Sequence, residues 1–167
     1  TLARMLTALD LTLGEDVLVV GAGTGYSVAA IAEVVGARHV HAIDIDRQAV
    51  HVARSNLAQA GYGAVLVDRR DGADGFPEYA PFDRILLEAA VIEPPRRLRE
   101  QLRPTGRLVY PRGTTVQTLT AVEPVSQHNR SDHESPTAPQ EADPAPPGFR
   151  AVETASSSSS STTRRSG

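Results

Sequence analysis

Three glycines and one acidic residue have the types and spacing to hold a nucleotide-like ligand. Gly21, Gly23 and Gly25 alternate with Ala22 and Thr24, and Asp44 follows about twenty residues later. Glycine lets the backbone approach a ligand without a Cβ in the way, and a carboxylate at the end of the next strand can accept two hydrogen bonds from a ribose diol. We therefore predict a nucleotide-type cofactor site made by Gly21, Ala22, Gly23, Thr24, Gly25, Asp44 and Ile45.

The flanking sequence predicts the elements that would position these residues. Four apolar residues, Val17–Val20, lead directly into the glycines, and Ser27–Val35 has the apolar spacing of a helix. A helix that begins here would present free N–H groups and a partial positive charge to the ligand. A second apolar run, His39–Ile43, then ends in Asp44. The order strand, glycine turn, helix and strand is typical of the first unit of a nucleotide-binding α/β domain.

The glycine spacing discriminates between cofactors. A dinucleotide fingerprint requires Gly-x-Gly-x-x-Gly, but Tyr26 occupies the sixth position counted from Gly21. Gly-x-Gly-x-Gly followed by an acid at the end of the second strand resembles the S-adenosylmethionine-dependent methyltransferases. That resemblance implies S-adenosyl-L-methionine as the cofactor. The alternative is a unit whose glycines serve only close packing.

The rest of the chain up to residue 122 alternates helix-like and strand-like segments. The predicted helices are Leu2–Leu9, Arg47–Ala60 and Pro95–Leu102, the last one charged and exposed, and the predicted strands are Ala64–Val67, Phe82–Leu87, Arg107–Tyr110 and Gln117–Val122. Such alternation predicts a Rossmann-like α/β fold with a mostly parallel sheet and helices on both faces.

The composition changes after residue 125. We expect a folded domain over 1–125, a disordered loop rich in Pro, Ser and acids over 126–147, a short strand of the same domain over 148–153, and a disordered Ser-rich tail over 154–167. Segments with so few apolar residues cannot bury enough surface to offset the entropy of ordering.

Composition argues against several classes of partner. The chain has no cysteine, its 17 basic residues are all Arg, and its net charge is −3 without a basic stripe. Nucleic acid is therefore not expected as a partner. An apolar run of about 20 residues, which a membrane span needs, does not occur. The five His lack ligand spacing, so we expect no metal. We expect a monomer in the cytoplasm.

An Asp-Gly pair, Asp71 and Gly72, follows the third predicted strand. Ligands of open α/β sheets bind at the carboxyl ends of the strands. Asp71 could there accept a hydrogen bond from an adenine amino group, although Asp-Gly is also a common turn.

From Leu6 to Val122 the chain resembles the protein-L-isoaspartate O-methyltransferase family. The similarity lies in the glycine motif followed by Tyr, the Asp-Gly pair, the strand entry Ala80–Asp83 and the segment Gln101–Gly113. The resemblance implies methyl transfer to the carboxylate of L-isoaspartyl residues in damaged peptides and proteins, a repair activity. It also implies a seven-stranded sheet whose last two strands, Gln117–Val122 and Phe149–Glu153, are antiparallel. Its substrate-side residues would be Glu88, Ala89, Pro111 and Gly113.

Two departures from the family pattern leave alternatives open. Glu88 stands where the family has small or hydroxyl residues, so its charge could repel a carboxylate substrate. The family's Ser/Thr-rich segment before the first helix is absent from this sequence, so activity of the chain could be impaired. A non-catalytic cofactor-binding relative or a small-molecule methyltransferase are the alternatives. No catalytic acid or base is assigned, because an acceptor carboxylate is already ionised at neutral pH.

Overall fold

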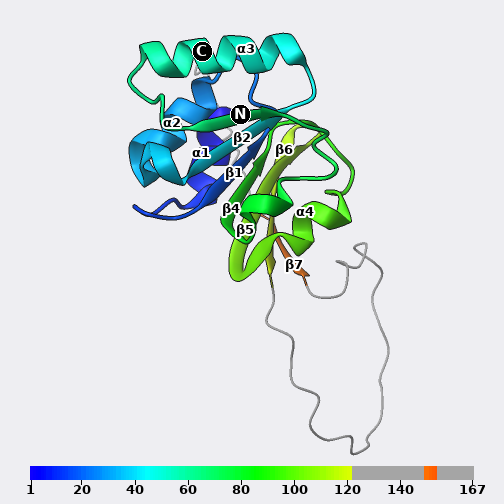
Figure 1. Cartoon of the computed structure of the whole chain (residues 1–167). Helices are drawn as coiled ribbons and strands as arrows, with labels where there is room; N and C mark the ends of the chain where they lie inside the picture. Colours follow the sequence, from blue (N-terminus) through cyan, green and yellow to red (C-terminus); the bar gives the residue numbers. More distant parts are fainter. Residues whose placement is uncertain (122–148, 154–167) are drawn as a thin grey trace, which may run out of the picture.

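The computed structural model describes residues 1–121 and 149–153, which form one seven-stranded sheet with helices (Figure 1). The strand order is β3-β2-β1-β4-β5-β6-β7. The strands are β1 (Val17–Val20), β2 (Val40–Asp44), β3 (Leu66–Arg69), β4 (Phe82–Leu87), β5 (Leu102–Arg112), β6 (Thr115–Ala121) and β7 (Phe149–Glu153). The helices are α1 (Leu2–Leu9), α2 (Tyr26–Val35), α3 (Arg47–Gln59) and α4 (Arg96–Glu100), with short 3-10 turns η1 (Ala37–His39) and η2 (Pro77–Tyr79).

Strand direction confirms the predicted fold class. The pairs among β3, β2, β1, β4 and β5 are all parallel, whereas β6 is antiparallel to both β5 and β7. The strand order reverses between β1, which neighbours β2, and β4, which continues the sheet on the other side. In open parallel sheets, ligands bind at such a reversal, beyond the carboxyl ends of the strands.

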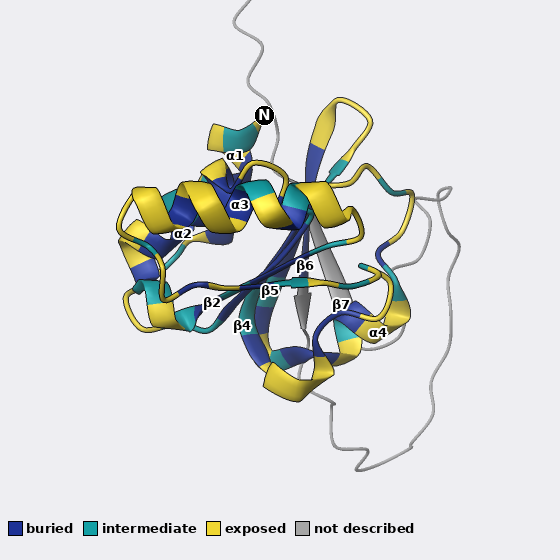
Figure 2. Cartoon of the chain, turned by 45° about the horizontal axis from the view of Figure 1, so that its top comes forward, coloured by how far each residue is buried: buried dark blue, intermediate teal, exposed yellow. Residues whose placement is uncertain are grey.

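The two faces of the sheet carry separate apolar cores. Alternate residues of a strand point to opposite faces, so Val17 and Val19 join one core while Leu18 and Val20 join the other. Helices α1, α2 and α3 cover the first face and α4 covers the second. Figure 2 shows the strands largely buried between these layers, with the outer surfaces of α2 and α3 exposed.

Helix α3 begins as the sequence predicts. The Asp46 carboxylate accepts the Gln48 backbone N–H at 2.8 Å and so caps the helix. A capping acid of this kind stabilises a helix by about 1 kcal/mol. The cap fixes the chain direction directly after Asp44, at the end of β2.

Several predicted bounds are wrong, most clearly around α4. The sequence predicts an exposed helix over Pro95–Leu102, but α4 spans Arg96–Glu100, and Leu98 is fully buried. The reason is that Leu102 already pairs with Phe82 and opens β5, five residues before the predicted start of that strand. Strand β3 likewise begins at Leu66, two residues later than predicted, and His39 lies in η1 and not in a strand.

The predicted loop 126–147 and tail 154–167 lie outside the described residues, so the domain limits remain a prediction. Across residues 1–121 and 149–153, no helix has the length and apolar character that crossing a membrane would require.

Candidate functional site

The glycine turn is held between β1 and β2 by backbone hydrogen bonds. The N–H groups of Gly21 and Ala22 both donate to the Ile43 carbonyl, at 2.8 and 3.1 Å, and the Gly25 N–H donates to the Ala22 carbonyl at 2.8 Å. These bonds close the turn before α2 begins at Tyr26. The glycine turn that follows β1 is therefore adjacent to the end of β2, where Asp44 lies.

Two of the glycines meet different surroundings. Gly23 has φ of 51°, and a Cβ added to it would meet nothing within 4 Å. It therefore presents open backbone at the surface of the turn. Gly25 has φ of 87°, and its added Cβ would lie 3.3 Å from the Ala53 backbone of α3. Close packing against α3 thus explains the glycine at position 25. At Gly23 the space beside the backbone is free for a ligand.

Asp44 is tied directly to the glycine turn. Its Oδ2 accepts the Gly23 N–H at 3.0 Å, and its Oδ1 accepts the Asp46 N–H at 2.9 Å. A carboxylate has about four acceptor positions, so each oxygen retains capacity for a ribose hydroxyl. Ile45, 64% exposed, follows it, and Thr24 is also exposed. The structure therefore brings together the predicted cofactor residues of the glycine turn, Gly21–Gly25, with Asp44 and Ile45.

The Asp71-Gly72 pair forms a turn after β3, as is common for an Asp-Gly sequence. Whether Asp71 also accepts a hydrogen bond from an adenine stays a prediction. Asp71 Oδ1 accepts the Ala73 N–H at 2.9 Å, while the side chain as a whole is exposed. A Cβ on Gly72 would lie 2.6 Å from Val20 Cγ1 at the end of β1. The absence of a side chain at Gly72 therefore lets this loop lie against β1, next to the glycine turn.

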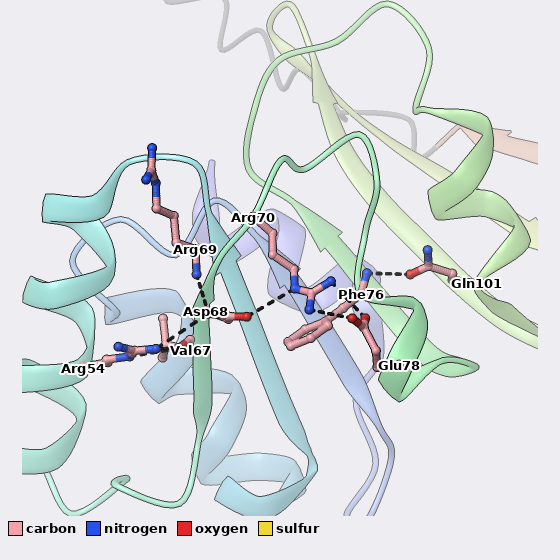
Figure 3. Close-up of polar contacts among 8 residues, drawn as sticks. All are labelled: Arg54, Val67, Asp68, Arg69, Arg70, Phe76, Glu78 and Gln101. Atoms are coloured by element: carbon pink, nitrogen blue, oxygen red, sulfur yellow. Dashed lines mark hydrogen bonds and ion pairs between the residues drawn. The ribbon is translucent and has the colours of Figure 1, made fainter.

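Arg70, which belongs to none of the sequence motifs, anchors this loop (Figure 3). The two terminal nitrogens of Arg70 donate to the two carboxylate oxygens of Glu78, at 2.6 and 2.9 Å. Its guanidinium lies 4.3 Å from the ring centroid of Phe76, and its Nε is 3.3 Å from Asp68 Oδ2. Paired guanidinium–carboxylate bonds add geometric specificity. Sequence spacing offers no signal for this contact, because it depends on how η2 folds back toward β3.

Gln101 fixes the same loop from the other side. Its Oε1 accepts the Phe76 N–H at 2.8 Å, and its Nε2 donates to the Asp74 carbonyl at 2.9 Å. Gly75 makes room for it, since a Cβ there would lie 2.4 Å from Gln101 Oε1. The first residue of the segment Gln101–Gly113 thus has a structural role in the loop after β3.

Glu88 follows β4 and lies beside the glycine turn. Its N–H donates to the Val20 carbonyl at 2.9 Å, and its Cβ lies 3.4 Å from a Cβ built on Gly21. Burial raises the pKa of the Glu88 carboxyl, a hydrogen bond from Ser27 of α2 works against that rise, and the charge of Asp44 adds to it. Within the described part of the chain, the buried Oε1 has no hydrogen-bond partner.

The other predicted substrate-side residues lie along the same edge of the sheet. Ala89 is exposed next to Glu88. In the β4–β5 register Leu86 faces Val109, so Pro111 lies two residues further along β5, as Glu88 lies beyond Leu86. Gly113, with φ of 60°, turns the chain from β5 into β6. Strand β4 therefore separates Pro111 and Gly113 from the glycine turn.

Asp83, at the start of β4, lies at the opposite edge of the sheet. Its Oδ2 accepts the Asp16 N–H at 2.8 Å, and its Oδ1 lies 3.1 Å from Arg103 Nε. The bond to Asp16 joins the start of β4 to the residue before β1, at the edge of the sheet away from the candidate cofactor residues.

Solved structures define the class of protein. A protein-L-isoaspartate O-methyltransferase superimposes with a TM-score of 0.64 at 29% identity, covering 72% of this chain and 39% of that one. A SAM-dependent O-methyltransferase from Thermotoga maritima gives 0.59 at 25% identity, covering 65% and 42%. The fold is that of class I methyltransferases.

Sequence comparison then identifies the family. The protein-L-isoaspartate(D-aspartate) O-methyltransferase family profile matches residues 1–136, and the chain belongs to that family. A protein-L-isoaspartate O-methyltransferase of Methanococcoides burtonii is 41% identical over 128 residues, 76% of this chain and 63% of that protein. One from Aeropyrum pernix is 48% identical over 124 residues, 72% of this chain and 47% of that protein. The resemblance inferred from motifs is confirmed, and the chain spans about half to two thirds of these relatives' length.

Proposed function

We propose that the chain binds S-adenosyl-L-methionine along the carboxyl edge of β3, β2 and β1. Asp71 would contact the adenine, Asp44 the ribose, and the turn Gly21–Gly25 the methionine part. Two observations support the fit: the open backbone at Gly23, and the carboxylate of Asp44 held against that turn at 3.0 Å. The second carries the proposal, because a carboxylate suited to a ribose diol then lies beside the backbone that must approach the cofactor.

We further propose that the protein transfers the methyl group to the carboxylate of L-isoaspartyl residues in peptides and proteins. The bound cofactor supplies an electrophilic methyl on a sulfonium. The acceptor carboxylate is ionised at neutral pH, so the chain need not supply a base. Its residues have to orient the two reactants and exclude water, which can contribute about 7–11 kcal/mol to lowering such a barrier. Family membership over residues 1–136 supports this assignment of substrate.

Calorimetry tests the cofactor assignment. The chain should bind S-adenosylhomocysteine and S-adenosylmethionine, and it should not bind NAD. Binding of NAD without any response to S-adenosylhomocysteine would overturn the proposal. Methyl transfer is tested separately, with labelled cofactor and a matched pair of peptides that differ only in an isoaspartyl or a normal aspartyl residue. Transfer selective for the isoaspartyl peptide is the expected result.

The alternatives predict other outcomes of the same assays. Cofactor binding without transfer to either peptide would favour a non-catalytic binding protein, as the carboxylate of Glu88 at this edge would suggest. Transfer to small carboxylic acids in preference to peptides would favour a small-molecule methyltransferase. Where the gene encodes residues upstream of Thr1, a longer version should be assayed alongside this chain.

We also propose that the protein acts as a monomer in the cytoplasm, without nucleic-acid or membrane partners. The lack of a basic stripe argues against nucleic-acid partners, and the lack of cysteine leaves no disulfide that could join two copies of the chain. Light scattering with and without S-adenosylhomocysteine tests the monomer, and a dimeric mass would contradict it.

A further inference from the structure

We propose that Glu88 is a cofactor-binding residue that accepts hydrogen bonds from the α-ammonium group of the methionine part of the cofactor. This inference rests on the proposed function and moves Glu88 from the acceptor side of the site, where the sequence suggested it, to the cofactor side.

The order of the strands places Glu88 at the methionine end. Asp71 follows β3, Asp44 ends β2, the glycine turn follows β1, and Glu88 follows β4. These strands are neighbours in the order β3-β2-β1-β4. A cofactor with its adenine at Asp71 and its ribose at Asp44 therefore extends past the glycine turn toward β4. The group that it brings to Glu88 is the amino-acid end.

The surroundings of Glu88 select the ammonium from the groups at that end. The buried Oε1 has no donor among the described residues, and a buried acceptor without a donor destabilises the ligand-free site. The ammonium carries three N–H donors and a positive charge, whereas the cofactor's own carboxylate would be repelled. Charge-assisted hydrogen bonds are about twice as strong as neutral ones.

The direction of the side chain also favours the cofactor over the acceptor. Glu88 contacts Ser27 of α2 and lies beside Gly21 of the turn. Both neighbours belong to the β1–α2 side of the site, and not to the β5–β6 turn that carries Pro111 and Gly113. Burial and the charge of Asp44 already raise the pKa of Glu88, and a cation placed here would relieve both effects.

Calorimetry with two ligands separates this role from a general effect on the site. S-Adenosylhomocysteine carries the ammonium, whereas 5′-methylthioadenosine lacks the whole amino-acid end. In Glu88→Gln, which keeps the shape but not the charge, affinity for S-adenosylhomocysteine should fall about 10-fold or more. Affinity for 5′-methylthioadenosine should not change. Glu88→Thr should give the same pattern, and Glu100→Gln, an exposed α4 residue paired with Arg96, should alter neither affinity.

Each other outcome overturns the inference. Equal losses for both ligands would mean that Glu88 only shapes the site. A loss for S-adenosylmethionine but not for S-adenosylhomocysteine would place Glu88 at the sulfonium. Unchanged affinity for both would remove Glu88 from the cofactor site while leaving the proposed function intact. Failure of the unaltered chain to bind S-adenosylhomocysteine would instead overturn the proposed cofactor, and this inference with it.

Discussion

At the scale of single residues, Asp44 does two tasks that only a carboxylate can do together. It accepts the N–H of Gly23 on one oxygen and the N–H of Asp46 on the other. An amide has one oxygen, so Asp44→Asn would leave one backbone N–H facing an NH₂ group. We expect it to weaken S-adenosylhomocysteine binding by about 1–3 kcal/mol, measured by calorimetry. Asp46→Asn keeps a helix cap and should bind normally; an equal loss in both variants would contradict the special role of Asp44.

Glu88 should make the stability of the ligand-free protein depend on pH. Burial raises its pKa in the folded state above the ordinary value of 4.5. Its stabilising contribution is therefore complete below that ordinary value and is lost as the pH rises through the folded-state pKa. Without ligand, Glu88→Gln should melt a few degrees above the unaltered chain at neutral pH. The difference should shrink as the pH falls toward 4, when followed by circular dichroism. A difference independent of pH would show that ionisation of Glu88 is not its source.

Glycine is required at position 72 because the loop lies close to Val20 of β1, a contact that the Asp-Gly sequence alone does not predict. A Cβ there would lie 2.6 Å from Val20 Cγ1. Gly72→Ala should destabilise the fold by about 1–3 kcal/mol in urea titrations, as other overpacked substitutions do. Gly63 offers a matched control, since its added Cβ would be 3.9 Å from the nearest heavy atom. Gly63→Ala should be neutral or stabilise by up to about 1 kcal/mol. Equal losses at both positions would contradict the close approach.

At the scale of elements, the loop between β3 and β4 depends on Arg70. Removing its contacts with Glu78 and Phe76 should loosen residues 71–79. We expect Arg70→Ala to speed amide exchange in that segment and to weaken S-adenosylhomocysteine binding. Arg70→Lys should not restore either property, because an ammonium lacks the planar fork. Arg96→Ala, which removes only an exposed pair with Glu100, is the control. Unchanged exchange in Arg70→Ala would mean that Gln101 alone holds the loop.

At the scale of elements, some bounds and contacts could be predicted from the sequence and others could not. Val17–Val20, Phe82–Leu87 and Leu2–Leu9 have the predicted bounds, because an apolar residue marks both ends of each segment. Asp44 could be placed beside the glycine turn because neighbouring parallel strands end at one edge. The start of β5 could not be predicted, since it depends on Leu102 pairing with Phe82 across the sheet. The loop contacts of Arg70 and Gln101 could not be predicted for a similar reason: their partners depend on the path of a loop, and not on periodicity.

At the scale of the whole molecule, the domain limits follow from composition and await a test. Residues 155–167 are almost entirely Ser, Thr, Arg and Gly, with little to bury. Their deletion should leave the melting temperature unchanged in differential scanning calorimetry. A drop of several degrees would show that the tail contributes to the fold and that the predicted limit at residue 153 is wrong.

The position of β7 has a consequence for the order in which the sheet is completed. Two residues, Gly113 and Thr114, connect β5 to β6, whereas residues 122–148 connect β6 to β7. Closing a loop costs about 0.6 kcal/mol for each doubling of its length, so β7 docks with a penalty about 2 kcal/mol larger than that of the β5–β6 hairpin. We expect β7 to dock last. Until it does, β6 is an edge strand whose free N–H and C=O groups can pair with another chain. The time that β7 takes to dock therefore sets how long a newly made molecule is open to aggregation.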